Sequence, residues 1–189
     1  MQKVQIASKF QGLPNKLTMM RIIAVPLLLI LFPWQFTSLR VICAIIFGLA
    51  AITDFFDGYL ARKYGAETKL GAVLDPISDK ILVTAALILL VGASIVPAWM
   101  ATALICREMA ISGLRLAATE QNFSITVNQL GKWKTGVQDL SIGFLMSTLP
   151  SLYGWGMGLL WLALGLSLYS GYRYWQEYWK NVEPTKNNQ

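Results

Sequence analysis

Residues 53–80 read TDFFDGYLARKYGAETKLGAVLDPISDK, and this stretch decides how the chain is interpreted. Four of the five aspartates in the chain fall within it, namely Asp54, Asp57, Asp75 and Asp79. The segments on either side are almost entirely apolar. An ionised side chain inside a membrane is costly, and such residues generally mark functional sites. The concentration of carboxylates here therefore predicts a site.

The composition is that of a membrane protein. Of the 189 residues, 55% are hydrophobic and only 14% are charged, whereas soluble domains carry about 25% charged residues. The apolar runs are too long and too numerous for a soluble core. We therefore expect an all-α integral membrane protein. The chain has no histidine, which excludes histidine as a catalytic base or metal ligand.

Six apolar segments predict six transmembrane helices, each near the roughly 20 residues that cross a bilayer. They run from about Leu17 to Phe32, Ser38 to Phe56, Leu70 to Val91, Val96 to Leu116, Trp133 to Leu149 and Tyr153 to Tyr174. Residues 1–16 interleave apolar side chains with lysines, as in a short amphipathic juxtamembrane helix or a polar tail. We expect a cytoplasmic segment at 1–16, one membrane domain at 17–179 and a cytoplasmic tail at 180–189.

The basic residues predict the orientation. The turns at 32–35, 92–97 and 148–156 contain no Lys or Arg, whereas the opposite connections and both chain ends contain several. By the positive-inside rule, both termini and the aspartates face the cytoplasm. A multi-pass protein of a bacterial-type inner membrane is expected, with a mitochondrial or plastid membrane left open. The net charge of +6 suits anionic lipid headgroups and requires no nucleic-acid partner.

The spacing of the aspartates predicts a divalent-metal site. Asp54 and Asp57 share one helical face, as do Asp75 and Asp79. The connection between the two helices is short, so the pairs are expected to face each other. Carboxylate oxygens favour Mg²⁺, Mn²⁺ or Ca²⁺ over zinc, and four of them suffice for two ions. Two alternatives remain: structural ion pairs with nearby lysines and arginines, or the ion path of a transporter.

The same stretch matches the pattern D-x-x-D-G-x-x-A-R-x8-G-x-x-x-D-x-x-x-D and resembles the signature of the CDP-alcohol phosphotransferase family. The fixed positions are Asp54, Asp57, Gly58, Ala61, Arg62, Gly71, Asp75 and Asp79. The resemblance implies that a CDP-linked lipid donates its phosphatidyl group to an alcohol and that CMP leaves. It also implies two Mg²⁺ (or Mn²⁺) ions held by the aspartates, Asp79 as general base, and a homodimer.

The resemblance also implies a set of contacts to the donor, CDP-diacylglycerol. In the motif itself these are Gly58, Arg62, Thr68 and Gly71. In the stretch LPNKLTMMR, residues 13–21, Asn15 and Thr18 match donor-nucleotide contacts. The alternative for this second stretch is an ordinary helix cap followed by an arginine that reaches the headgroups.

Two further stretches bear on the acceptor alcohol: CREMAISGLR at 106–115 and NQLGKWKT at 128–135. We expect Arg107, Arg115, Lys132 and Lys134 to bind an acceptor phosphate. Glu108 is expected to point away from Arg107, because adjacent helical residues face different directions. Glycerol 3-phosphate and inositol phosphate both fit, and the resemblance favours glycerol 3-phosphate. The alternatives are serine or phosphatidylglycerol as acceptor and, from another class, a divalent cation transporter.

Overall fold

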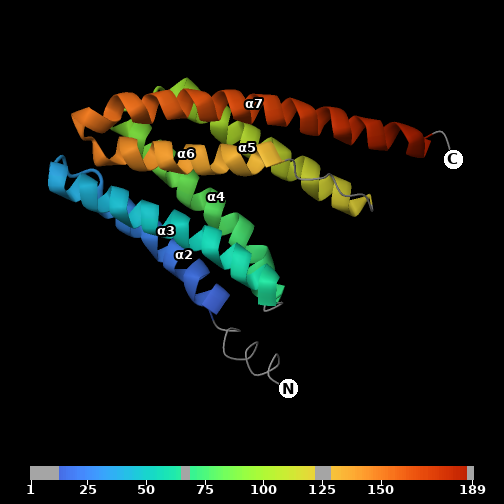
Figure 1. Ribbon diagram of the computed structural model, residues 1–189, viewed down its shortest axis with the longest axis horizontal. Helices are drawn as coiled ribbons and strands as arrows, with labels where there is room; N and C mark the ends of the chain where they lie inside the picture. Colours follow the sequence, from blue (N-terminus) through green and yellow to red (C-terminus); the bar gives the residue numbers. More distant parts are fainter. Residues whose placement is uncertain (1–12, 65–68, 122–128, 187–189) are drawn as a thin grey trace, which may run out of the picture.

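The computed structural model describes residues 13–64, 69–121 and 129–186, and within them the side chains of residues 21, 23–53, 80–121 and 133–181. Every regular element in these ranges is an α-helix (Figure 1). The helices are α2 (Leu13–Leu31), α3 (Thr37–Tyr64), α4 (Lys69–Gly92), α5 (Ala98–Glu120), α6 (Gln129–Ser147) and α7 (Pro150–Lys186). The all-helical class predicted from the sequence is confirmed for the described residues. The predicted amphipathic helix falls largely on residues 1–12, outside those described.

Helices α3 and α7 are longer than the apolar segments that predicted them. Helix α3 continues past Phe56 to Tyr64, and α7 continues past Tyr174 to Lys186. Residues 175–183 (WQEYWKNVE) include neither glycine nor proline, so nothing in them stops the helix. Pro184 lies within the last few residues of α7. Hydropathy marks the end of an apolar stretch, whereas a helix continues until its backbone is interrupted. Most of the predicted tail at 180–189 therefore belongs to α7.

Tight turns connect two pairs of helices. Between α4 and α5, Ser94 adopts a left-handed conformation with a φ of 58°, and the N–H of Ile95 donates to the main-chain oxygen of Leu90 at 2.9 Å. Between α6 and α7, Thr148 adopts the same conformation with a φ of 52°. Such residues reverse the chain within a few positions. The turns therefore fold α5 back against α4 and α7 back against α6.

The core runs through the middle of the bundle and involves every described helix. Helix α6 packs mainly on α7 and α3, α2 packs on α3 and α4, and α5 packs on α7. The largest fully buried apolar side chains are Leu28, Phe32, Phe47, Leu82, Leu87, Leu90, Met100, Leu104, Ile142, Leu145 and Met146. Helices α3 and α4 touch each other only sparsely. They are instead held together through α2, which lies against both.

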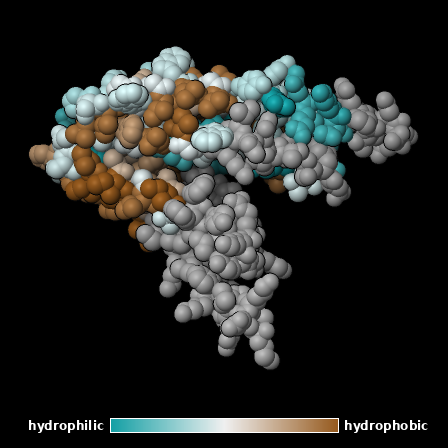
Figure 2. Space-filling model, viewed as in Figure 1, coloured by the Kyte–Doolittle hydropathy of each residue, from teal (hydrophilic) through white to brown (hydrophobic). Residues whose placement is uncertain are grey.

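The outward faces of the helices are also apolar. Figure 2 shows hydrophobic side chains over much of the described surface, with hydrophilic residues gathered near the end of α7. Large exposed hydrophobic residues occur on every helix and include Ile30, Ile45, Ile88, Leu116, Leu140, Trp161 and Leu168. Soluble monomers rarely expose contiguous apolar surface on this scale. Such a surface is the kind that lipid covers.

One described helix, Pro150–Asn181 in α7, is long and apolar enough to cross a membrane by itself. Residues Thr37–Thr53 and Lys80–Gly92 form shorter apolar helical segments. Helix α7 has 37 residues, which at about 1.5 Å per residue exceeds the roughly 30 Å of a hydrocarbon core. The helix is therefore longer than the hydrocarbon layer that it could cross.

Candidate active site

The four aspartates lie where α3 ends and α4 begins. Asp54 and Asp57 belong to α3, and Asp75 and Asp79 belong to α4. Only residues 65–68 separate the two helices, so their carboxylate-bearing ends lie close together (Figure 1). Their side chains are outside the described set. The helical backbone nevertheless gives each pair the spacing that places both members on one face.

The other predicted donor-binding residues lie in the same part of the fold. Asn15 and Thr18 are in α2, Gly58 and Arg62 in α3, and Gly71 in α4. The predicted acceptor residue Lys132 is in α6. Their side chains, and the whole of Thr68, fall outside the described residues.

The donor set at these helix ends fits a hard divalent cation. Four carboxylates are available, and a chain without histidine offers no imidazole nitrogen. Oxygen-only ligands select Mg²⁺ or Mn²⁺ over zinc. Among the side chains that the structure describes, no three His, Cys, Asp or Glu residues gather to form another metal site.

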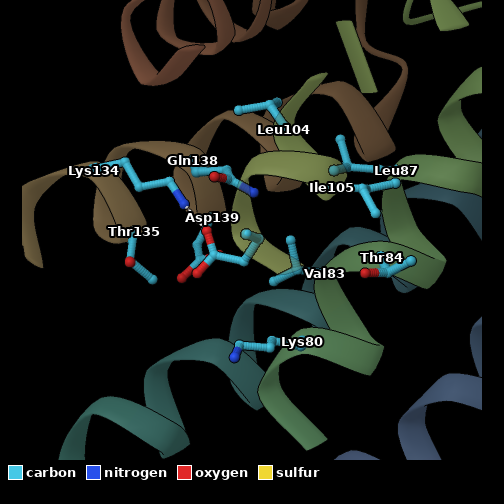
Figure 3. A pocket seen from close by; sticks show the side chains of 11 residues that line it. Lys80, Val83, Thr84, Leu87, Leu104, Ile105, Lys134, Thr135, Gln138 and Asp139 are labelled. Carbon is cyan, nitrogen blue, oxygen red and sulfur yellow. Dashed lines mark hydrogen bonds and ion pairs between the residues drawn. The ribbon is translucent and has the colours of Figure 1, made fainter. Parts of the chain in front are cut away.

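A pocket lies between α4, α5 and α6, next to the carboxylate-bearing start of α4 (Figure 3). Its lining residues are Lys80, Val83, Thr84 and Leu87 from α4, Leu104, Ile105 and Glu108 from α5, and Lys134, Thr135, Gln138 and Asp139 from α6. Lys80 directly follows Asp79 in the sequence. The pocket and the aspartates therefore belong to one region. Charged and amide groups lie at one side of the pocket, against a wall of Val and Leu.

Glu108 is the centre of the charge network in this pocket. Its Oε2 accepts a hydrogen bond from Lys134 Nζ and another from Arg107 Nη1 at 3.2 Å. The Lys134 side chain is only 4% exposed, and that of Glu108 is 34% exposed. The prediction that Glu108 points away from Arg107 is wrong. Both side chains are long enough to turn toward each other, and Lys134 on α6 holds the carboxylate in place.

Arg107 also binds α7. Its Nε donates to the main-chain oxygen of Ser167 at 2.8 Å, and its Nη2 donates to Ser170 Oγ at 2.6 Å. Together with the contact to Glu108, these bonds use three directions of one planar guanidinium. Arg107 therefore ties α5 to α7 while it faces the Lys134 ammonium across a shared carboxylate.

Lys80 extends the network on the α4 side. Its Nζ donates to Ser112 Oγ, and Ser112 Oγ donates to the main-chain oxygen of Glu108 at 2.7 Å. Arg115 lies apart from the pocket lining. Its Nη2 is 3.4 Å from the Tyr174 hydroxyl, and its guanidinium carbon is 5.9 Å from the centre of the Tyr174 ring. Of the predicted acceptor residues with described side chains, Arg107 and Lys134 come together, and Arg115 does not join them.

Sequence reasoning missed several residues of the pocket. It treated Lys80 only as a structural partner for the aspartates, and it did not single out Gln138 or Asp139. The available signal was spacing, because Gln138 follows Lys134 by four residues and so shares its helical face. Lys80 follows the final aspartate of the motif and could have been placed by that adjacency.

The all-helical fold, the four aspartates on adjoining helices and the basic pocket beside them fit an enzyme that transfers a phosphate-containing group with the help of a divalent metal. The family model described as CDP-alcohol phosphatidyltransferase matches residues 11–169, so the chain belongs to this family. It is therefore a transferase, of a family that generally depends on a divalent metal.

The curated relatives carry closely related names. A CDP-diacylglycerol–glycerol-3-phosphate 3-phosphatidyltransferase of Bacillus subtilis (strain 168) is 38% identical over 188 residues, covering 91% of this chain and 97% of that protein. The protein with the same name from Rickettsia bellii is 38% identical, covering 88% of this chain and 94% of that protein. A cardiolipin synthase (CMP-forming) of rice is 36% identical, covering 91% of this chain and 59% of that protein.

Proposed function

We propose that the chain transfers the phosphatidyl group of CDP-diacylglycerol to sn-glycerol 3-phosphate, giving phosphatidylglycerol phosphate and CMP in phospholipid biosynthesis. The observation that carries this proposal is the pocket with Lys80 and Lys134, directly beside the carboxylate-bearing start of α4. A phosphate on the acceptor suits such a pocket, because ammonium groups are common phosphate ligands. The names of the bacterial relatives support the same reaction.

On the donor side, Asp54, Asp57, Asp75 and Asp79 would hold two Mg²⁺ or Mn²⁺ ions, which would supply charge neutralisation at the diphosphate during displacement. Arg62 pairs with a diphosphate oxygen. Asn15, Thr18, Gly58, Thr68 and Gly71 complete the contacts to the CDP-diacylglycerol headgroup.

Asp79 receives the proton of the acceptor hydroxyl. The hydroxyl oxygen then forms a bond to the phosphorus that carries the diacylglycerol, while the bond from that phosphorus to the CMP oxygen breaks. Helix α4 supports this assignment because it carries Asp79 and the pocket residue Lys80 at adjacent positions. The assignment requires the Asp79 carboxylate to reach a hydroxyl of a molecule anchored in the pocket.

On the acceptor side, Lys134 and Arg107 bind the phosphate of glycerol 3-phosphate, with Lys132 and Arg115 as outer contacts. The two inner cations already share one anionic oxygen, that of Glu108. A position that binds one carboxylate oxygen between two cations is suited to a phosphate oxygen as well. Arg115 on the exposed side of α5 adds positive charge along the approach from the cytoplasm.

The membrane arrangement is also part of the proposal. All six helices span a bacterial-type inner membrane, residues 1–16 lie on its surface, and both termini and the active site face the cytoplasm. The apolar outward faces of the helices and the basic connections support this arrangement. The acyl chains of the donor stay among the surrounding lipids. A homodimer is expected by analogy with the family.

A second acceptor has a specific observation in its favour. The rice relative named cardiolipin synthase is similar over 91% of this chain, which makes phosphatidylglycerol the strongest competing acceptor. Inositol phosphate and serine are further candidate acceptors for the same chemistry. Membership of a transferase family disfavours the divalent cation transporter considered from the sequence.

The test measures CMP release by the purified protein in detergent with CDP-diacylglycerol and Mg²⁺. Glycerol 3-phosphate, phosphatidylglycerol, inositol phosphate and serine are compared, each with and without EDTA. Release that needs both metal and glycerol 3-phosphate supports the proposal. Release with a different alcohol discards the assigned acceptor. Folded protein that releases no CMP, yet moves divalent cations into sealed vesicles, would instead be a transporter.

A further inference from the structure

Gln138 on α6 has a buried acceptor atom without a donor. Its side chain lines the pocket, the residue is 5% exposed, and its Oε1 accepts no hydrogen bond from the part of the chain that the structure describes. Buried polar atoms are nearly always hydrogen-bonded, and each exception calls for an explanation. An unpaired amide oxygen at a pocket wall is explained by a donor that arrives with a ligand.

The described surroundings of Gln138 supply no hydrogen bond to its Oε1. Across the pocket, Val83, Leu87, Leu104 and Ile105 present only hydrocarbon. The polar α4 residues of the lining are Thr84 and Lys80, and Lys80 Nζ donates to Ser112 Oγ instead. The neighbouring ammonium of Lys134 is bonded to Glu108. Figure 3 shows the Lys134 and Gln138 side chains extending from one face of α6, as their spacing of four residues requires.

The two α6 groups together describe a ligand. Lys134 suits an anionic oxygen, whereas Gln138 Oε1 requires a hydrogen-bond donor such as a hydroxyl. A molecule with a phosphate and a free hydroxyl a few bonds away satisfies both. This inference rests on the proposed function, in which glycerol 3-phosphate is the acceptor.

Glycerol 3-phosphate has two hydroxyl groups. The C1 hydroxyl forms the new phosphodiester, so the C2 hydroxyl remains free throughout the reaction. We infer that Gln138 Oε1 accepts a hydrogen bond from the C2 hydroxyl and thereby selects phosphorylated diols over simple phosphorylated alcohols. A site built to bond a hydroxyl rejects the analogue that lacks it, because its own polar group is then left unpaired.

The experiment compares sn-glycerol 3-phosphate with 3-hydroxypropyl phosphate, which retains the phosphate and a terminal hydroxyl but lacks the C2 hydroxyl. The values of kcat/KM for CMP release are measured for wild-type protein and for Gln138→Met, which keeps the length of the side chain and removes the amide. Gly136→Ala on the exposed face of α6 is the matched control, since an added Cβ there meets nothing within 4 Å.

Wild-type protein should prefer glycerol 3-phosphate by roughly three- to tenfold or more, the effect of one net hydrogen bond. Gln138→Met should remove most of this preference by lowering kcat/KM for glycerol 3-phosphate alone, and Gly136→Ala should keep it. A general packing defect in Gln138→Met would instead lower kcat/KM equally for both substrates, and that result overturns the inference.

The comparison of the two substrates with wild-type protein alone also tests the inference, so the test does not require Gln138→Met to fold. Equal use of the two substrates by wild-type protein would overturn it. Failure of the proposed function gives a different result. Wild-type protein would then release CMP with another alcohol but with neither glycerol 3-phosphate nor 3-hydroxypropyl phosphate. That outcome also removes the basis of the inference.

Discussion

Glu108 on α5 and Lys134 on α6 form an ion pair in the wall of the pocket, and the lysine side chain keeps only 4% of its exposure. An ammonium group buried to this degree requires a counter-charge, because desolvation of a lone ion costs several kcal/mol. Glu108 provides the counter-charge and shares it with Arg107. Glu108 therefore balances charge on both cations, and the proposed anionic acceptor would compete with it for them.

Glu108→Gln should lower stability while it improves binding of glycerol 3-phosphate. The variant keeps a hydrogen-bond acceptor but removes the anionic oxygen that Arg107 and Lys134 share, at a cost of roughly 1–3 kcal/mol. The same change removes a negative charge that opposes the acceptor phosphate, so KM for glycerol 3-phosphate should fall. Thermal unfolding in detergent and steady-state kinetics measure the two effects.

Two controls sharpen that prediction. Glu120→Gln, at the exposed end of α5, should change neither quantity appreciably. The double variant Glu108→Gln with Lys134→Met should recover much of the lost stability, because both members of the pair are then neutral. Additive losses in the double variant would show that the two residues do not act as a pair.

Arg107→Lys should destabilise the protein more than Arg115→Lys does. A lysine at position 107 cannot reproduce the three directional bonds to Glu108, Ser167 and Ser170. The expected loss is roughly 1–3 kcal/mol, against less than about 0.5 kcal/mol for Arg115→Lys at an exposed position. Equal unfolding temperatures for the two variants would contradict the role of Arg107 as a link between α5 and α7.

Gly156→Ala should destabilise the α6–α7 contact. A Cβ at this position would lie 2.8 Å from Leu145 Cγ, and Leu145 is itself fully buried and unable to yield. Overpacking of this kind costs roughly 1–3 kcal/mol. Gly158→Ala, two residues further along α7 with nothing within 4 Å, should be neutral or slightly stabilising. Thermal unfolding of both variants in the same detergent decides the matter.

Asp79→Asn should reduce CMP release by at least about 100-fold, since the variant has no general base. The fold should persist, and thermal unfolding should stay close to that of wild-type protein. Ser78→Ala provides a control at the adjacent position and should retain activity. Near-normal turnover by Asp79→Asn would remove the base assignment.

EDTA should abolish CMP release by wild-type protein, and excess Mg²⁺ or Mn²⁺ should restore it. The restoration is the informative half of the measurement, because it distinguishes loss of metal from irreversible damage by the chelator. Full activity after exhaustive chelation would contradict a metal-assisted reaction.

The sequence predicted the C-terminal ends of α2 and α4 to within one residue, because in both the apolar stretch and the helix stop at nearly the same position. It failed for α7, because hydropathy is silent about a polar continuation that remains helical to Lys186. It also assigned Arg107 and Lys134 to one acceptor pocket from their charge and the family resemblance, and both contact Glu108 in the structure.

Two details of the site were beyond reach of the sequence. The position of the Glu108 carboxylate depends on Lys134 from another helix. Helical spacing alone had predicted that Glu108 points away from Arg107. The proposed role of Gln138 depends on its Oε1 being buried without a hydrogen bond from the described residues around it. Both depend on the tertiary arrangement of α4, α5 and α6, which one-dimensional spacing does not contain.

The most direct test of the proposed function identifies the lipid product. Purified protein is incubated with CDP-diacylglycerol, Mg²⁺ and ¹³C-labelled glycerol 3-phosphate, and the lipids are extracted and measured by mass spectrometry. The proposed reaction predicts phosphatidylglycerol phosphate with the label in its headgroup, formed in equal amount to CMP. CMP accompanied only by phosphatidic acid, or by a lipid without the label, would contradict it.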